Sequence, residues 1–430
     1  MKSLNICIAG LGNVGSSVVS SIESNNSIYN SKASLNFNIL GVSAKNISKK
    51  RDCNIDSLKW FDNPLDLLKI NNCQVLIELI GDEKGISFDL VKNALEKKIH
   101  VVTANKALIA KNGFELFKIA ENNNVLLLYE AAVAGGIPII KVLKNNIFLN
   151  NIKKISGILN GTTNYILTTM ENENLNFDDV ISIAQSKGYT SPKESELDIG
   201  GLDSAHKLTL LASLSFGVEI NFQNNHITGI SKIKIEDIVN AKKLGYKIKL
   251  ISEATIINNK LYCVTEPKLI NSSKPLANVD GVLNAINIQT DHLDSLFLEG
   301  EGAGGKATAS SVISDLYEIS SQSNINSLGY KINNLKKIDK INILNIKSAY
   351  YLRIMTKDIA GVLSKITSYF NDSNISIQKM LQLPDNTEQP IPIIISTHQV
   401  EKDKLLKAID NIEKQDFVLE KIVIIPIDES

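Results

Sequence analysis

Asp203 and Lys207 lie four residues apart at the start of a segment whose apolar residues repeat with helical spacing. Because residues four apart share one face of a helix, both side chains would point the same way. Asp203 is also suited to cap that helix. A lysine whose pKa is lowered by burial and nearby cations can exchange protons near neutral pH, so the pair could act as an acid–base centre. The alternative is a surface ion pair with no role in chemistry.

A glycine-rich turn, GLGNVG at 10–15, follows the first strand-like segment and precedes a helix-like one. Glycines permit a tight turn and let backbone N–H groups approach a pyrophosphate at the positive end of the helix. The strand before it, the helix after it and the strand–helix alternation that follows are the context that such a motif requires. The alternative is a glycine turn that binds nothing. We predict a dinucleotide site made by Gly10, Gly12, Asn13, Val14 and Gly15.

The next strand-like segment, FNILGVSAKN at 37–46, bears on the choice of cofactor. An acidic residue at its end would bind the ribose 2′-OH of NAD, whereas a basic one would accommodate the 2′-phosphate of NADP. The segment ends with Lys45 and Asn46, and residues 49–51 are all basic. This favours NADP, with NAD as the second possibility and Lys45 as the candidate ligand. A solvated basic loop is the alternative interpretation.

Further segments, in this order after the glycine turn, closely resemble the homoserine dehydrogenase family. Several separated motifs in register make the match specific, and it spans essentially the whole chain. The segments are VVTANKALIA (101–110), EAAVAGGIPII (130–140), GILNGTTNYILT (157–168), LDIGGLDSAHKL (197–208), PLANVDGVLNAI (275–286) and GAGGKATAS (302–310).

The resemblance implies an oxidoreductase that interconverts L-aspartate 4-semialdehyde and L-homoserine by direct hydride transfer, on the route to threonine, methionine and isoleucine. It assigns Lys207 as the acid–base group at the substrate oxygen, with Asp203 orienting it. It places Lys106 between the nicotinamide and the aldehyde carbonyl. Lys106 follows a strand at the carboxyl edge, where doubly wound sheets bind ligands, and a cation there opposes the helix dipole, which disfavours a merely structural role.

The resemblance also implies substrate contacts and a cation site. Asp198 matches an acidic residue at the substrate, and Thr162 and Tyr189 match positions that bind its amino-acid part. The loop that begins at Glu130 resembles a monovalent cation site, and hard oxygen ligands suit such an ion. Its sodium ligands would be Glu130 and the carbonyls of Val133, Gly135 and Ile137.

One departure from the family pattern affects the substrate site. Ser191 stands where the family has the glutamate that holds the substrate ammonium group, and a hydroxyl cannot replace that charge. Glu194 or Glu196 could take over if the loop is rebuilt. This departure supports the alternatives: another Rossmann-type amino-aldehyde dehydrogenase, or an inactive sensor of cofactor or amino acid.

The elements that must position these residues predict an α/β protein in several parts. Strand-like runs, among them 125–133, alternate with helices in a Rossmann-type doubly wound sheet over 1–133. A mixed α/β substrate-binding and oligomerisation domain covers 134–310, and a return helix with a linker covers 311–345. The polar stretch 320–342 is typical of a solvated connector.

The last part, 346–430, has strand and helix patterns in the order βαββαβ, which predicts a ferredoxin-like unit. It resembles an ACT domain, the small-ligand sensor that some family members carry. The resemblance implies threonine as a possible effector, and a homodimer or homotetramer.

The bulk composition excludes several classes. Lys+Arg and Asp+Glu number 46 each, so no basic field recruits nucleic acid or anionic membrane. No apolar run approaches the length of a membrane span. Cys7, Cys53, Cys73 and Cys263 are scattered without metal-ligand spacing, which predicts reduced thiols and a cytoplasmic protein.

Overall fold

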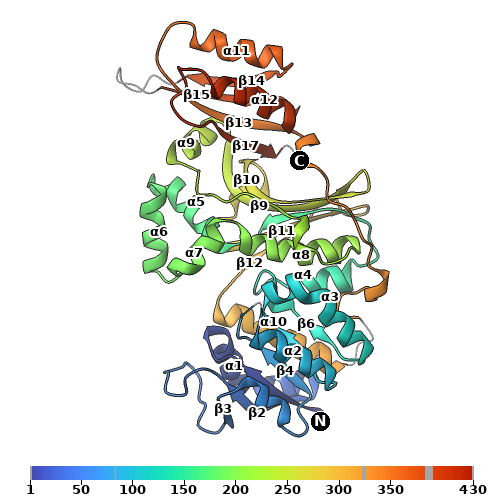
Figure 1. The fold of residues 1–430 in the computed structure, drawn as a ribbon. Coiled ribbons are helices and arrows are strands. Elements are labelled where there is room, and N and C mark those ends of the chain that lie inside the picture. The colour runs from blue at the N-terminus through green and yellow to red at the C-terminus, as the bar shows by residue number, and fades with distance from the viewer. Residues whose placement is uncertain (1, 83, 322–325, 383–390, 429–430) are drawn as a thin grey trace.

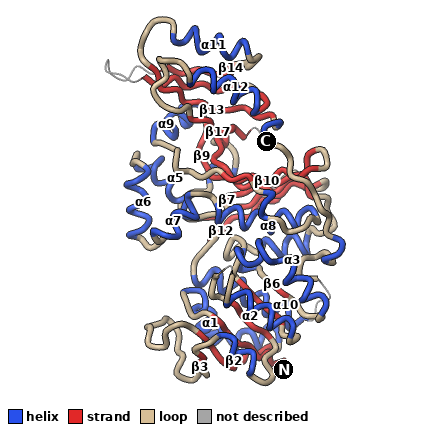
Figure 2. Tube along the Cα trace, in the orientation of Figure 1, coloured by secondary structure: helices blue, strands red, loops and turns tan. Residues whose placement is uncertain are grey.

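A computed structural model describes residues 2–82, 84–321, 326–382 and 391–428. The N-terminal part lies at one end, the last part of the chain lies at the other, and a layer of helices on a sheet separates them (Figure 1). Strands gather into two sheets, and helices cover their faces (Figure 2). None of the helices in these ranges is long and apolar enough to cross a membrane.

The first sheet has six parallel strands in the order β3-β2-β1-β4-β5-β6. This is the order of a doubly wound dinucleotide-binding sheet, which confirms the predicted Rossmann-type fold. Its central strands are buried almost throughout because helices cover both faces. The strands are β1 (Lys2–Ala9), β2 (Leu35–Ser43), β3 (Trp60–Phe61), β4 (Val75–Glu78), β5 (His100–Thr103) and β6 (Leu127–Leu128).

The helices around this sheet are α1 (Asn13–Ala33), the 3-10 helix η1 (Pro64–Lys69), α2 (Ile86–Glu96), α3 (Lys106–Asn122) and α10 (Gly305–Ser321). Although α10 comes much later in the chain, it returns to pack beside α1, and both helices bury apolar residues in one core cluster. The return of α10 brings its N-terminus next to the start of α1.

The strand predicted over 125–133 was wrong beyond its first half. After β6 the chain forms a 3-10 turn, η2 (Glu130–Ala132), and leaves the sheet. The two carboxylate oxygens of Glu130 accept hydrogen bonds from the N–H groups of Ile140 (2.8 Å) and Lys141 (2.9 Å). Glu130 thereby caps the short helix α4 (Ile139–Lys141), which continues as the π-helix η3 (Val142–Asn146). A contact across ten residues thus ends the strand, and local apolarity could not reveal it.

The second sheet begins with the strand order β12-β11-β7-β9-β10. These strands are β7 (Ile152–Ile158), β9 (Tyr246–Ile257), β10 (Lys260–Asn271), β11 (Leu283–Thr290) and β12 (Leu296–Glu301). The helices of this part are α5 (Gly161–Glu173), α6 (Phe177–Ser186), α7 (Pro192–Ile199), α8 (Leu202–Phe216) and α9 (Ile235–Leu244). The helix α8 packs on this sheet and also contacts α3 of the first part, so it lies at the junction of the two parts.

The last part of the chain has the predicted order βαββαβ. Its elements are β13 (Lys347–Thr356), α11 (Val362–Asp372), β14 (Ile377–Gln382), β15 (Ile391–Thr397), α12 (Lys402–Glu413) and β17 (Val423–Asp428), with a two-residue strand β16 (Val400–Glu401) before α12. The four main strands are antiparallel in the order β17-β13-β15-β14.

The strand β17 also pairs with β10, so the two groups of strands form one continuous sheet. A buried ion pair fastens this junction: Asp237 of α9 accepts from Arg353 Nε at 2.8 Å and from the Tyr351 hydroxyl at 3.0 Å. All three side chains are almost fully buried.

The connector is not the solvated linker that its composition predicted. Its described residues include Leu328, Ile332 and Leu335, which are buried in the core cluster shared by the first two parts. Bridges at Lys336 and Lys340 add backbone pairing to the middle part. A few apolar residues at the right spacing therefore hold a polar segment against the surface.

Candidate active site

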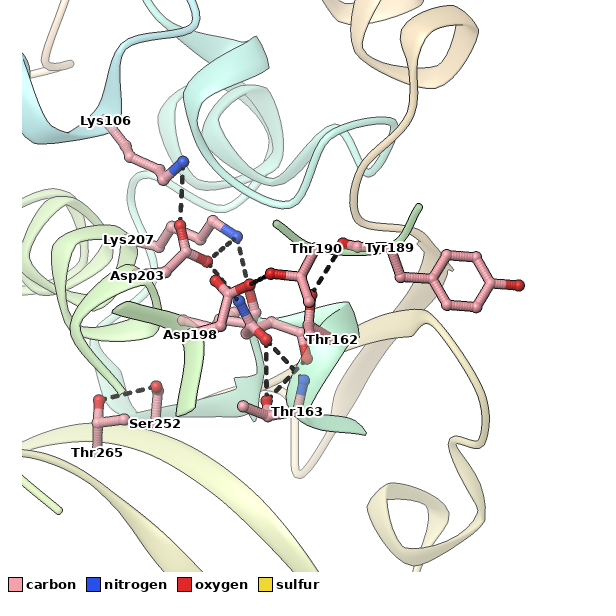
Figure 3. A network of polar contacts seen from close by, with 12 residues as sticks. Lys106, Thr162, Thr163, Tyr189, Thr190, Asp198, Asp203, Lys207, Ser252 and Thr265 are labelled. Atoms are coloured by element: carbon pink, nitrogen blue, oxygen red, sulfur yellow. Dashed lines mark hydrogen bonds and ion pairs between the residues drawn. The ribbon is translucent and has the colours of Figure 1, made fainter. Parts of the chain in front are cut away.

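Two lysines and one carboxylate meet where α3 faces α8 (Figure 3). Asp203 in the first turn of α8 bridges both lysines: its Oδ1 lies 3.0 Å from Lys106 Nζ, and its Oδ2 lies 2.8 Å from Lys207 Nζ. Gly201 rather than Asp203 is the N-cap of α8. The Asp203 carboxylate is therefore available to the two lysines, and the predicted capping role was wrong.

Lys207 is held in a fixed position. Its side chain is 9% exposed, and besides Asp203 its ammonium donates to the carbonyl of Leu159 at 2.6 Å. Leu159 directly follows β7, so the sheet, α5 and α8 together fix the nitrogen. Lys106 begins α3 at the carboxyl end of β5, and its side chain is 38% exposed. Lys207 is thus buried, whereas Lys106 is partly exposed to solvent.

The charges of the cluster act on one another. Burial alone would raise the pKa of Asp203, but Lys106 and Lys207 outweigh it and hold the pKa well below the usual value, so the carboxylate stays ionised. The same carboxylate raises the pKa of Lys106, which favours its charged form. Burial, and then the charge of Asp203, raise the pKa of Asp198.

Asn160 is a member of the site that the sequence reasoning missed. Its Nδ2 donates to Asp198 Oδ1 at 2.7 Å and to Asp203 Oδ2 at 2.9 Å, so one amide joins the two carboxylates. Its Oδ1 accepts from the N–H of Thr163 and caps α5. An asparagine before a predicted helix start is a capping signal. The contact with two distant carboxylates has no local signal.

Thr162 and Tyr189 are adjacent, but not through the tyrosine ring. The Thr162 hydroxyl donates to the backbone carbonyl of Tyr189 at 3.3 Å. The ring points away from the two lysines (Figure 3) and packs edge-on against Tyr165, with ring centroids 4.8 Å apart. The structure therefore brings Thr162 and the Tyr189 backbone to the cluster and leaves the Tyr189 ring 44% exposed beside it.

The segment around Ser191 is a helix rather than a loop. Ser191 is the N-cap of α7, and its hydroxyl and the Glu194 carboxylate form a capping box with Pro192 at the first helical position. The pattern S-P-x-E is a sequence signal of a helix start, and it could have been recognised. Glu194 is exposed, and its negative charge contributes to the raised pKa of Lys106, after the larger effects of Asp203. The Glu194 carboxylate accepts from the Ser191 hydroxyl at 2.7 Å and so lies directly beside Ser191.

The glycine turn has the close packing that its sequence predicts. Gly10 has a φ of +104°, and a Cβ there would lie 2.4 Å from the carbonyl oxygen of Leu79. A Cβ at Gly15 would lie 2.0 Å from the carbonyl oxygen of Gly10. Asn13 and Val14 open α1 directly after Gly12, which leaves the first N–H groups of the helix at the turn. A pyrophosphate could bind at this helix terminus.

Lys45 and Arg51 differ in their relation to this turn. Lys45 is exposed after the end of β2. The Arg51 guanidinium instead donates to the carbonyls of Leu11 (3.3 Å) and Lys49 (2.8 Å) and stacks over Trp60. Arg51 thus joins the glycine turn to the loop after β2, where sequence reasoning placed a 2′-phosphate.

The four residues of the predicted sodium site lie in one tightly packed loop. Glu130 is buried, and both of its carboxylate oxygens accept backbone N–H groups, as described above. The carbonyl of Gly135 accepts from Ser311 Oγ at 2.6 Å. Burial, and then Asp315, raise the pKa of Glu130 to about 8. No cluster of three or more His, Cys, Asp or Glu side chains suited to a metal occurs in the described ranges.

Comparison with known proteins is consistent with this geometry. A family model described as homoserine dehydrogenase matches residues 138–317, and one described as homoserine dehydrogenase, NAD binding domain, matches residues 10–130. The homoserine dehydrogenase of Neisseria gonorrhoeae is 35% identical over 99% of this chain and 98% of its own. That of Helicobacter pylori is 35% identical over 97% of each chain.

Solved structures give the same result. The crystal structure of a homoserine dehydrogenase from Thiobacillus denitrificans has a TM-score of 0.92 at 34% identity and covers 99% of this chain and 98% of that one. A hyperthermophilic archaeal homoserine dehydrogenase mutant in complex with NADPH has a TM-score of 0.64 at 28% identity, over 75% of this chain and 99% of that one.

Proposed function

This chain belongs to the homoserine dehydrogenase family, and from that premise we propose that it interconverts L-aspartate 4-semialdehyde and L-homoserine with a nicotinamide cofactor. The observation that carries the proposal is the cluster of Lys106, Asp203 and Lys207 between the Rossmann-type part and the middle part. When bound, the reduced cofactor supplies a hydride to the aldehyde carbon. The residues of the chain then have to manage the charge on the substrate oxygen.

We assign that task to the two lysines. Lys207 gives a proton to the developing alkoxide, and its bonds to Asp203 and to the Leu159 carbonyl fix the nitrogen for the transfer. Lys106 stays positively charged beside Asp203 and polarises the carbonyl from the exposed side. Asp198 and Thr162 hold the amino-acid end of the substrate. No covalent intermediate is needed, because the proton and the hydride balance the reduction.

The decisive test is oxidation of NADPH in the presence of L-aspartate 4-semialdehyde, with NADH in parallel. Turnover that forms homoserine would support the proposal. Tight NADPH binding without turnover of this substrate would overturn it and would direct attention to other amino-aldehydes or to a sensor role.

We propose NADP as the preferred cofactor. Arg51 supports this preference because it places a positive charge beside the glycine turn, in the loop that follows β2. Replacing Arg51 with glutamine is expected to raise KM for NADPH about tenfold, since it removes one charge-assisted contact. KM for NADH should stay unchanged because NADH lacks the 2′-phosphate.

Steady-state kinetics with both cofactors measures this effect, and Lys45→Gln is the matched control for loss of an exposed positive charge. An equal loss with NADH would mean that Arg51 only supports the loop, and a larger effect of Lys45→Gln would return the assignment to Lys45.

We propose that Glu194 binds the substrate ammonium group that a glutamate at the position of Ser191 would otherwise hold. Its carboxylate lies 2.7 Å from the Ser191 hydroxyl, next to the position that the family glutamate would occupy, and this supports the role. Glu194→Gln keeps a side-chain oxygen for Ser191 but removes the charge. We expect KM for the semialdehyde to rise about tenfold with little change in kcat, the cost of one ionic hydrogen bond.

The control for this variant is Glu196→Gln, the other acidic candidate on α7. A rise in KM for Glu196→Gln and none for Glu194→Gln would assign the ammonium contact to Glu196 instead.

We further propose the remaining features that the family resemblance implies. Sodium would be held by Glu130 and the carbonyls of Val133, Gly135 and Ile137. All four residues supply oxygen ligands, and the positive ion would balance the negative charge of the buried Glu130 carboxylate. The βαββαβ unit would act as an ACT domain with threonine as effector. A homodimer or homotetramer and a cytoplasmic location complete the proposal, and the four free thiols are in keeping with a reducing compartment.

A further inference from the structure

Lys249 is a lysine of β9 whose side chain is 1% exposed. A buried ammonium group is costly unless each of its protons finds an acceptor. Here it donates to the carbonyl of Val279 at 2.6 Å, to Asp280 Oδ1 at 2.9 Å and to Asn164 Oδ1 at 3.1 Å. The proposed mechanism uses none of these residues, so the cost of burying this charge has no explanation in the reaction steps described above.

These partners belong to two segments that pack against each other. Val279 and Asp280 lie in the loop before β11, and Asn164 lies on α5. Asn164 itself donates to the carbonyls of Val279 (3.0 Å) and Leu283 (3.2 Å), so it and Lys249 hold the loop from both sides. The start of α5 presses on the same loop, because a Cβ at Gly161 would lie 2.5 Å from the carbonyl oxygen of Val282.

The connection to the reacting groups is short. Asn164 is one helical turn after Asn160, and its N–H donates to the Asn160 carbonyl at 3.3 Å. Asn160 in turn donates to Asp198 and Asp203, and Asp203 holds both lysines of the site. A shift in the first turn of α5 would therefore move the carboxylates that orient Lys106 and Lys207.

We propose that Lys249 is a positioning residue for the reaction: it fixes the first turn of α5, and through Asn160 the two carboxylates of the active site. The proposal rests on the proposed function, because the group that it positions is assigned there. Lys249 touches neither substrate nor cofactor. Its effect should fall on the semialdehyde side of the kinetics and leave cofactor binding as it is.

The chain offers a matched control. In the antiparallel pair of β9 and β10, Lys268 stands directly opposite Lys249. Its side chain is 7% exposed and forms an ion pair with Glu253 at 3.1 Å, and among the described residues it forms no hydrogen bond with α5 or with the loop before β11. Lys249→Met and Lys268→Met each remove one buried ammonium group from the same sheet, so both variants should lower the unfolding temperature.

Activity should separate the two variants. For Lys249→Met we expect kcat/KM for the semialdehyde to fall at least tenfold, since misplacement of about 1 Å can cost 100-fold in rate. The Kd for NADPH should be unchanged, and Lys268→Met should keep wild-type kcat/KM when assayed well below its unfolding temperature. Wild-type activity is measured first, because its absence would count against the proposed function and not against this role.

Asp280→Asn gives a second, milder test if Lys249→Met does not fold. The Asp280 side chain is 44% exposed, so we expect the change to be tolerated. It removes the negative charge that Lys249 contacts at 2.9 Å and Lys247 at 3.6 Å, and it keeps a side-chain oxygen for Lys249. It should lower kcat/KM for the semialdehyde less than Lys249→Met would, again without an effect on NADPH. Full activity in Lys249→Met, or in Asp280→Asn where Lys249→Met does not fold, would overturn the proposal. Equal losses in Lys249→Met and Lys268→Met would also overturn it.

Discussion

Replacing Lys207 with methionine is expected to lower kcat about 1,000-fold, within the range that a general acid contributes. Methionine has similar length and suits a side chain that is 9% exposed, but it has no proton to give to the substrate oxygen. The measurement is kcat for NADPH-dependent reduction of the semialdehyde. NADPH binding, followed by cofactor fluorescence, should be retained because Lys207 lies on α8 and not at the glycine turn.

Two controls make this result specific. The unfolding temperature shows whether the variant is folded, and Lys106→Met removes the other lysine of the same cluster. Lys106 polarises the carbonyl but gives no proton. The decrease in kcat for Lys106→Met should therefore be smaller than for Lys207→Met, and the affinity for the cofactor should decrease as well. Residual activity of Lys207→Met close to wild type would remove Lys207 from the mechanism.

Replacing Asp203 with asparagine should lower kcat/KM about 100-fold, as expected when reacting groups lose their alignment. The amide keeps the shape of the side chain, but it presents an NH2 group to one of the two ammonium groups that the carboxylate now bridges at 3.0 and 2.8 Å. Both lysines would therefore move.

The pH dependence of activity and stability tests whether the effect of Asp203→Asn comes from the lost negative charge. Because the pKa of Asp203 is held well below its usual value, the carboxylate stays charged throughout the working range, and the activity gap between wild type and variant should persist from weakly acidic to alkaline pH. A group with a depressed pKa contributes stability that is present above its unfolded value and lost as pH falls through the folded value. The difference in unfolding temperature between the wild type and Asp203→Asn should hence become smaller only in strong acid. A gap that closes near neutral pH would contradict this account.

Much of this fold follows from local patterns. The alternation of strands and helices predicted for the first part of the chain is present in the structure. The order βαββαβ is also as predicted, because each of these segments has a clear hydrophobic period and a clear turn at its end. The pair Asp203 and Lys207 was found the same way, since helical spacing puts both on one face.

The parts that were not predicted depend on contacts between distant residues. The strand after 125 ends early because Glu130 caps a helix ten residues away, and the connector is ordered because Leu328 and Ile332 reach a core formed elsewhere. Asn160 bridges carboxylates 38 and 43 residues further along the chain. The orientation of the Tyr189 ring follows from packing on Tyr165. The capping box at Ser191 and the helix cap at Asn160 each had a local signal that was overlooked.

The pairing of β10 with β17 also shortens the strand edges that the protein exposes. A strand at the edge of a sheet presents unpaired N–H and C=O groups, which invite pairing with strands of other molecules. The pairs Leu269–Ile427 and Ile270–Asp428 occupy part of a strand edge on each side of the junction, which would otherwise be open there. The apolar side chains of β17, Ile425 and Ile427, are buried by the same contact. Separating the two parts would therefore expose two strand edges that could pair with strands of other molecules. Each part shields such an edge of the other.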